Sequence, residues 1–122
     1  RFHSPFEKGQ YAKHTIGLPK QSEPILWQAV WRTDGQAREQ AFAKLKTTNW
    51  QRQMRVIREG SVPFTMINGS KDPFINHTYC ASPEFNTAAS GKPITLDGVG
   101  HATFLEGPEG FNAVFRRFIQ QQ

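Results

Sequence analysis

Two residues of this 122-residue chain combine the residue types and the setting that acid–base chemistry requires. Asp72 follows one short apolar run, and His101 follows another further along the chain. A carboxylate that accepts the ring N–H of a histidine fixes the tautomer of the imidazole and stabilises the imidazolium when the ring takes up a proton. Taken singly, Asp72 fits an ordinary turn and His101 an ordinary loop. Together they predict a general base and the carboxylate that orients it.

Two short strands are expected to position this pair. The run Val62–Ile67 is apolar on both faces and ends in turn-forming residues, which is typical of a buried parallel strand. A second strand is predicted over Lys92–Leu96, and Asp97–Gly100 ends it. Adjacent strands lie about 4.8 Å apart, so the loops that follow two parallel neighbours emerge side by side. Ligands of open α/β sheets bind at this carboxyl edge, where we expect Asp72 and His101 to meet.

Helices are predicted in both parts of the chain from apolar residues at helical spacing. In the first part, Ser22 is the candidate cap of a helix with Pro24 in its first turn. Two more helices are expected over residues 37–45 and 50–57, whereas Arg1–Lys20 is less regular. In the second part we expect a short helix over Asn76–Phe85 and loops over residues 88–91 and 101–108. A C-terminal helix is predicted from its apolar stripe of Phe111, Val114, Phe115 and Phe118.

These elements divide the chain near residue 61. We expect residues 1–60 to form a helical segment and residues 61–122 to form two parallel strands with their helices, which makes the fold α/β. Two parallel strands cannot cover both of their faces, and each exposed edge invites further pairing. The first residue is Arg and not Met. We therefore expect the chain to be about half of a longer α/β protein.

A nucleophile is missing from the pattern. The chain has no Gly-x-Ser-x-Gly, the strand-to-helix turn that presents a catalytic serine in many hydrolases. Ser70 follows Gly69 but precedes Lys71 and Asp72, as in a turn. A base without a nucleophile activates nothing, so we expect a segment outside this chain to supply the nucleophile and the oxyanion donors.

Two stretches of the second part resemble the α/β-hydrolase superfamily. Val62–Phe74 resembles the penultimate core strand and acid loop, and Gly98–Phe118, which begins Gly-Val-Gly-His, resembles the histidine loop and the last helix. The resemblance implies that the chain is the C-terminal half of such a hydrolase and that residues 1–60 are its helical cap. This cap is most similar to those of α/β-hydrolase-fold N-acyl-homoserine lactonases, through Tyr11–Thr15 and Trp31–Arg38, with Ile67–Gly69 in the core.

The resemblance also assigns roles to single residues. Asp72 matches the triad acid and His101 the triad base, in the superfamily's order of acid before histidine. The lactonases have Glu at the acid position, and Asp72 departs from them there. Tyr11 matches a cap tyrosine that hydrogen-bonds the substrate, although an ordinary half-buried tyrosine is the alternative. Further residues expected to shape the acyl pocket are Trp27, Trp31 and Phe6, although the two tryptophans, one turn apart, also fit a packed core.

Composition limits the other classes of function. The formal net charge is +5, but the basic residues are scattered and interrupted by acids, so we expect no nucleic-acid partner. No apolar run approaches the roughly 18 residues of a membrane span. One cysteine, Cys80, excludes an internal disulfide. The histidines lack metal-ligand spacing, and we expect no metal and no cofactor. A cytoplasmic location is expected.

The prediction is thus part of a serine-dependent α/β-hydrolase that opens an ester or lactone, with an N-acyl-homoserine lactone as the expected substrate. A general carboxylesterase, an epoxide hydrolase and a dehalogenase are the alternatives within the superfamily. The last two require Asp as the upstream nucleophile. Two alternatives without catalysis are a catalytically inert fragment and a basic binding module. Salt-sensitive binding of DNA or RNA would identify the binding module.

Overall fold

A computed structural model describes residues 5–60, 62–85 and 92–121. Helices predominate, and the two strands are short. In chain order the elements are α1 (Pro5–Ile16), α2 (Pro24–Arg32), α3 (Gly35–Thr47), α4 (Trp50–Glu59), β1 (Ile67–Gly69), α5 (His77–Cys80), the 3₁₀ turn η1 (Pro83–Phe85), β2 (Ile94–Leu96), α6 (Thr103–Glu106) and α7 (Pro108–Gln120).

The two strands pair in parallel, as the sequence predicted. Ile67 lies opposite Ile94, and Gly69 lies opposite Leu96. The position of β1 differs from the prediction, because Val62–Met66 is not strand and the expected turn residues Asn68 and Gly69 are. A strand forms only where a neighbour accepts its hydrogen bonds. Within the described residues, β1 pairs with β2 alone. The hydrogen-bonded ladder is therefore no longer than β2.

The helices predicted between residues 22 and 59 are confirmed, with one change in capping. Asp34 caps α3 by accepting a hydrogen bond from the Gln36 N–H at 2.8 Å, and Asn49 caps α4 by accepting from the Arg52 N–H at 3.0 Å. Ser22 is not the cap of α2. That position is taken by Glu23, which makes no side-chain cap bond, and Pro24 fills the first turn. Proline needs no N–H partner there, so α2 begins without a capping side chain.

Two helices were not predicted. The segment before residue 20 forms α1, in which Ala12 and Ile16 are the buried positions among residues 7–16. Because so few apolar residues recur at helical spacing, the sequence of this segment shows no apolar stripe that would indicate a helix. The expected loop between His101 and Pro108 contains α6, a single turn. The expected helix over Asn76–Phe85 splits into α5 and η1, and the predicted loop over residues 88–91 lies outside the described residues.

A small apolar cluster joins α1 and α2. Its buried members are Ala12, Ile16 and Val30, and Trp27 packs against them while its indole N–H donates to the Leu18 carbonyl at 2.9 Å. Leu105 of α6 packs against the same cluster. The helical pair is therefore held to the segment that follows β2.

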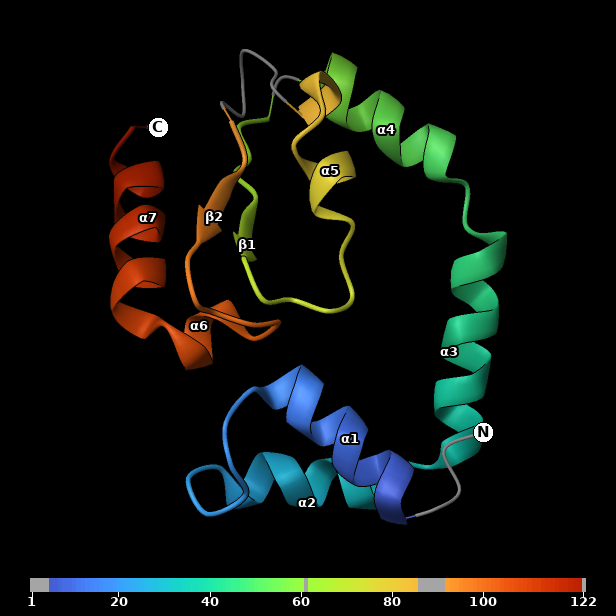
Figure 1. The fold of residues 1–122 in the computed structure, drawn as a ribbon. Helices are drawn as coiled ribbons and strands as arrows, with labels where there is room; N and C mark the ends of the chain where they lie inside the picture. Colours follow the sequence, from blue (N-terminus) through green and yellow to red (C-terminus); the bar gives the residue numbers. More distant parts are fainter. Residues whose placement is uncertain (1–4, 61, 86–91, 122) are drawn as a thin grey trace.

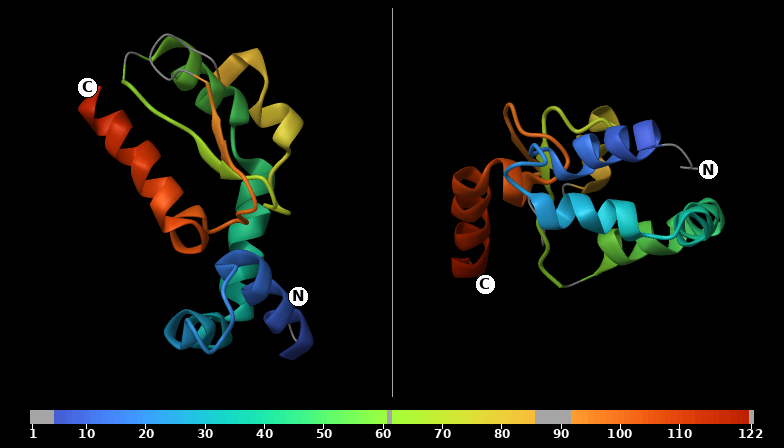
Figure 2. Two further views of the ribbon diagram at one scale, coloured as in Figure 1. Left: turned by 60° about the vertical axis from the view of Figure 1, so that its left-hand side comes forward. Right: turned by 90° about the horizontal axis from the view of Figure 1, so that it is seen from below.

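The helices surround the sheet unevenly. The pair α1 and α2 lies beyond the carboxyl ends of the strands, and α3 runs from this pair to α4 (Figure 1). Figure 2 shows α7 on one side of the sheet and α4 and α5 on the other. On the α7 side, Gly110 lies close enough to β2 that a Cβ there would be 3.5 Å from Cδ2 of Leu96. The close approach of α7 covers one face of β2.

Much apolar surface stays exposed. The accessible surface is 8986 Å² for a chain of 13.9 kDa. A folded monomer of this mass exposes about 6,700 Å² by the usual scaling. Large side chains on several elements contribute, among them Ile25, Val56, Val62 and Phe104. The described residues thus bury less than a self-contained domain does. None of the described helices is long and apolar enough to cross a membrane.

We predict that Gly69→Ala lowers the free energy of unfolding of the complete gene product by about 3 kcal/mol, measured by urea denaturation. Gly69 is buried, and a Cβ at this position would overlap the backbone carbonyl oxygens of Val99 and Gly100. These backbone atoms cannot move aside without breaking the bond from the Lys71 N–H to the Val99 carbonyl. Gly110→Ala is the control, since its Cβ meets only ordinary van der Waals contacts. Equal stability of the two variants would contradict the prediction.

Candidate active site

The two loops that leave the sheet are fastened to each other. The N–H of Ser70 donates to the Leu96 carbonyl at 2.9 Å, and the N–H of Lys71 donates to the Val99 carbonyl at 2.8 Å. The Ser70 hydroxyl donates to the Asp97 carboxylate at 3.1 Å and accepts from the Gly98 N–H at 2.9 Å. These bonds keep the two loops side by side beyond the ends of the strands, as far as Asp72 on one loop and His101 on the other.

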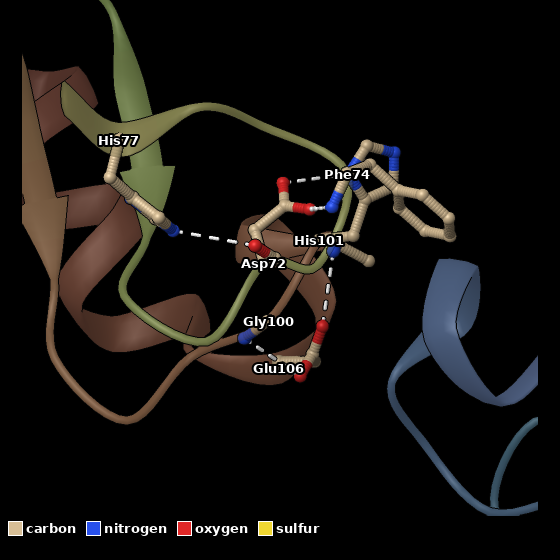
Figure 3. A network of polar contacts seen from close by, with 7 residues as sticks. Asp72, Phe74, His77, Gly100, His101 and Glu106 are labelled. Carbon is tan, nitrogen blue, oxygen red and sulfur yellow. Dashed lines mark hydrogen bonds and ion pairs between the residues drawn. The ribbon is translucent and has the colours of Figure 1, made fainter. Parts of the chain in front are cut away.

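Asp72 and His101 meet as the sequence predicted. Oδ2 of Asp72 lies 2.8 Å from Nδ1 of His101 (Figure 3). The carboxylate side chain is 5% exposed and the imidazole 43% exposed. Because the buried carboxylate only accepts, the neutral ring donates from Nδ1 and keeps Nε2 as its acceptor. The pair therefore presents a basic nitrogen on a ring that remains accessible.

The second carboxylate oxygen of Asp72 is also used. Oδ1 accepts the Phe74 N–H at 2.8 Å, which fixes the carboxylate by a turn of its own loop. On the other side, Nε2 of His77 lies 3.3 Å from the Asp72 carbonyl oxygen. The Phe74 ring packs edge-on against the His101 imidazole, with centroids 5.0 Å apart. Both members of the pair are held from the acid loop.

Glu106 holds the histidine loop from below. Its carboxylate accepts the Gly100 N–H and the Ala102 N–H, each at 3.0 Å, so the two amides that flank His101 share one side chain (Figure 3). The resemblance to α/β-hydrolases includes a glutamate at this distance after the histidine, but sequence reasoning gave it no role. The only sequence signal for these two hydrogen bonds is a glutamate that follows two glycines at the end of a single helical turn, and this signal is weak.

The end of α1 meets the same carboxylate. Gly17 ends α1 with a φ of 74°, and a Cβ there would overlap the Glu106 side chain. Only glycine combines this backbone conformation with this close approach. The end of α1 therefore lies directly against the Glu106 carboxylate that holds the backbone around His101.

A cavity of about 570 Å³ lies between the helical pair and the histidine loop. His101 lines it on one side and Tyr11 on the other, so Tyr11 shares a cavity with the pair. The remaining lining residues are Thr15, Ile16, Leu26, Ala29, Val30, Thr33, Arg38, Ala102, Phe104 and Leu105. The wall is mostly apolar, as a site for an aliphatic chain requires.

The two tryptophans expected in the pocket lie elsewhere. Trp27 and Trp31 do not line this cavity. They stack on each other with centroids 5.7 Å apart, and Trp27 packs against the cluster whose members Ile16 and Val30 form the cavity wall. The backbone of Phe6 lies in α1, but its side chain is outside the part of the chain that the structure describes.

The arrangement provides a base and its orienting acid. No serine lines the cavity within the described ranges, and Ser70 is engaged in fastening the loops. Across residues 5–60, 62–85 and 92–121 there is also no group of three or more side chains fit to hold a metal ion. The chemistry on offer is proton transfer at Nε2 of His101, directed at a group that enters the cavity.

We predict that Glu106→Gln loosens the histidine loop. Glutamine has one carbonyl acceptor, and its amide nitrogen would face the second backbone N–H. Loss of one hydrogen bond to a charged acceptor should speed hydrogen exchange at the Gly100 or Ala102 amide by at least about tenfold, measured by NMR. The same substitution at the exposed Glu109 is the control and should leave both amides protected. Unchanged hydrogen exchange at both amides in Glu106→Gln would show that the Glu106 carboxylate does not hold the histidine loop.

Comparison with known proteins gives one group of matches. No protein-family model and no curated protein matches the chain. Three crystal structures of the N-acyl homoserine lactonase AidH match it at 32% sequence identity. A variant with a glutamate replaced by glycine, complexed with N-hexanoyl homoserine, has a TM-score of 0.83 and covers 98% of this chain and 42% of its own.

The other two structures agree. The lactonase complexed with N-butanoyl homoserine has a TM-score of 0.77, over 97% of this chain and 42% of its own. A variant with a serine replaced by glycine, complexed with N-hexanoyl homoserine lactone, has a TM-score of 0.78, over 97% of this chain and 43% of its own. This chain thus spans less than half the length of the proteins it matches. The predicted resemblance is confirmed: the chain is similar, along nearly all of its length, to part of an N-acyl homoserine lactonase.

Proposed function

We propose that the chain is the C-terminal part of a serine-dependent α/β-hydrolase that opens the ring of N-acyl homoserine lactones. The observation that carries the proposal is the hydrogen bond between Asp72 and His101 at the carboxyl ends of two parallel strands, beside a mostly apolar cavity. The structural similarity to a lactone-hydrolysing enzyme supports hydrolysis as the reaction class.

The ligands of the similar structures support a serine nucleophile. The variant that lacks a serine is complexed with the intact N-hexanoyl homoserine lactone. The other two are complexed with acyl homoserines, in which the ring is open. We infer that the complete protein carries a serine of the same role in the segment that precedes this chain, together with the oxyanion donors.

In this mechanism His101 acts twice. Nε2 takes the proton of the serine hydroxyl as its oxygen attacks the lactone carbonyl, and Asp72 stabilises the imidazolium that forms. The C–O bond of the ring then breaks, and the imidazolium gives its proton to the departing alkoxide of the homoserine. Water attacks the resulting acyl-enzyme with the same base, and the products are the N-acyl homoserine and the regenerated serine. The two steps together consume one lactone and one water and return the serine to its starting form.

Asp72 fills a position where the lactonases it resembles have Glu. An aspartate side chain is shorter by one methylene, so its loop must approach the histidine more closely. The bonds between Ser70, Asp97 and Gly98 draw the two loops together, and the 2.8 Å contact supports a working pair. Either carboxylate can orient the imidazole, because the requirement is an ionised acceptor at Nδ1.

The helices α1 to α4, within residues 1–60, serve as the cap in this proposal. Tyr11 faces the substrate from the cap side of the cavity, and the acyl chain lies against Ile16, Leu26 and Leu105. Trp27 and Trp31 support this wall from behind by packing. The large exposed apolar surface is the surface that the N-terminal half of the hydrolase covers.

We predict that Asp72→Asn lowers kcat/KM of the complete gene product toward N-hexanoyl homoserine lactone by about 10³- to 10⁴-fold. Asparagine can offer its N–H₂ to Nδ1 and so hold the ring in the wrong tautomer. Ring opening is followed by titration of the acid released. Asp34→Asn is the matched control, since asparagine caps a helix as well as aspartate does. A His101→Ala variant that kept turnover within about twofold would refute the assignment.

A substrate panel separates the lactonase from other hydrolases of this fold. We expect kcat/KM for N-hexanoyl homoserine lactone to exceed that for p-nitrophenyl hexanoate by at least about tenfold, because the cavity would recognise the lactone as well as the chain. Preference for the simple ester would identify a general carboxylesterase. An aspartate in place of the upstream serine would instead identify an epoxide hydrolase or a dehalogenase.

A further inference from the structure

Arg38 lies in an unusual position for a charged residue. It is 8% exposed, and it is the buried residue of α3, a helix whose other residues are exposed or half-buried. Arg38 is also one of the residues that line the cavity together with His101. A buried cation costs several kcal/mol unless it is paired, so its presence in this wall calls for a compensating group.

The described residues compensate Arg38 only in part. Nη2 donates a hydrogen bond to the Val30 carbonyl, and the guanidinium carbon lies 5.1 Å from the centroid of the Tyr11 ring, within the range of a cation–π interaction. Nη1 is buried and has no hydrogen-bond partner within the described ranges. No described carboxylate forms an ion pair with Arg38. Both N–H groups of Nη1 are therefore unused in the part of the chain that the structure describes.

We propose that Arg38 is a specificity residue that donates a hydrogen bond from Nη1 to the amide carbonyl oxygen of the substrate's acyl group. This inference rests on the proposed lactonase function. Nη1 is buried in the described part of the chain, and a turn of the guanidinium about its bond to the Val30 carbonyl, away from the Tyr11 ring, would present Nη1 to the cavity.

The chemistry of an acyl homoserine lactone selects the amide as the acceptor. The lactone carbonyl must face the nucleophile and His101, and its oxygen belongs to the oxyanion donors. The other strong acceptor is the carbonyl of the amide that links the ring to the chain. Arginine can only donate, and it therefore matches this oxygen, whereas it forms no such bond with a substrate that has a methylene in the same place.

A purely structural role predicts a different pattern. If Arg38 only ties α3 to the end of α2 through the Val30 carbonyl, its loss loosens the cavity for every substrate equally. If it binds the amide, its loss affects only substrates that contain an amide. Two lactones of the same ring size and the same chain position, N-hexanoyl homoserine lactone and α-heptyl-γ-butyrolactone, differ in this group and distinguish the two roles.

The test compares Arg38→Met and Arg38→Lys in the complete gene product. We expect Arg38→Met to lower kcat/KM for N-hexanoyl homoserine lactone by at least about tenfold, through KM, and to change kcat/KM for α-heptyl-γ-butyrolactone by less than about twofold. Arg38→Lys, which keeps a cationic donor, should recover part of the loss. Arg32→Met, at an exposed arginine of α2, is the control and should change neither. Equal losses for both lactones, or no loss for either, would overturn the proposal.

A binding measurement separates this proposal from the proposed function. If the unmodified protein hydrolyses neither lactone, the lactonase function fails, and N-hexanoyl homoserine lactone becomes an unreactive ligand. Its binding is then measured by calorimetry. Binding that Arg38→Met weakens by at least about tenfold would support amide recognition on its own. Absent binding, or binding that the substitution leaves unchanged, would refute it.

Discussion

The parallel pairing of β1 with β2 is the constraint on which the rest of the site depends. Each strand has only three residues, yet the register places Gly69 opposite Leu96, so both loops leave the sheet at one edge. The bonds of Ser70 to Leu96, Asp97 and Gly98 then carry this alignment beyond the strands. A shift of one residue in the register would reverse the sides of the side chains and separate Asp72 from His101.

The two members of the pair have different surroundings, and the difference suits the proposed roles. The Asp72 carboxylate is buried and has acceptor bonds on both oxygens, so it orients and does not react. The His101 ring is half-exposed and turned toward the cavity. Glu106 holds the backbone on both sides of His101, and Gly17 brings α1 against Glu106. The helical pair of α1 and α2 and His101 are thus connected through one carboxylate.

Sequence reasoning found the pair because its signal is local. A polar residue directly after a strand lies at the carboxyl edge whatever the exact strand bounds are, and so the prediction survived the displacement of β1 from Val62–Ile67 to Ile67–Gly69. Those bounds depend on where β2 offers a partner, which Val62–Met66 alone does not reveal. Over residues 7–16 of α1, two buried residues among polar ones gave no stripe that could be recognised.

Arg38 and Glu106 were beyond sequence reasoning for a different reason. An arginine in a polar helix is expected to face solvent, and only the contacts of Arg38 with the Tyr11 ring of α1 and the Val30 carbonyl of α2 account for its burial. A glutamate five residues after a histidine has no periodic signature, and its role depends on two amides that fold back onto it. Arg38 acts through contacts with other helices, which one sequence does not encode locally, whereas the bonds of Glu106 reach back four and six residues and depend on how the histidine loop turns.

The central claim is that Asp72 and His101 act as one unit in the hydrolysis of a lactone. A double-mutant cycle on kcat/KM with Asp72→Asn, His101→Ala and both changes together tests it most directly. If Asp72 acts through His101, the double variant should be as slow as His101→Ala alone, within about twofold. If the two losses multiply in the double variant, the residues contribute independently, and the account of the pair is wrong.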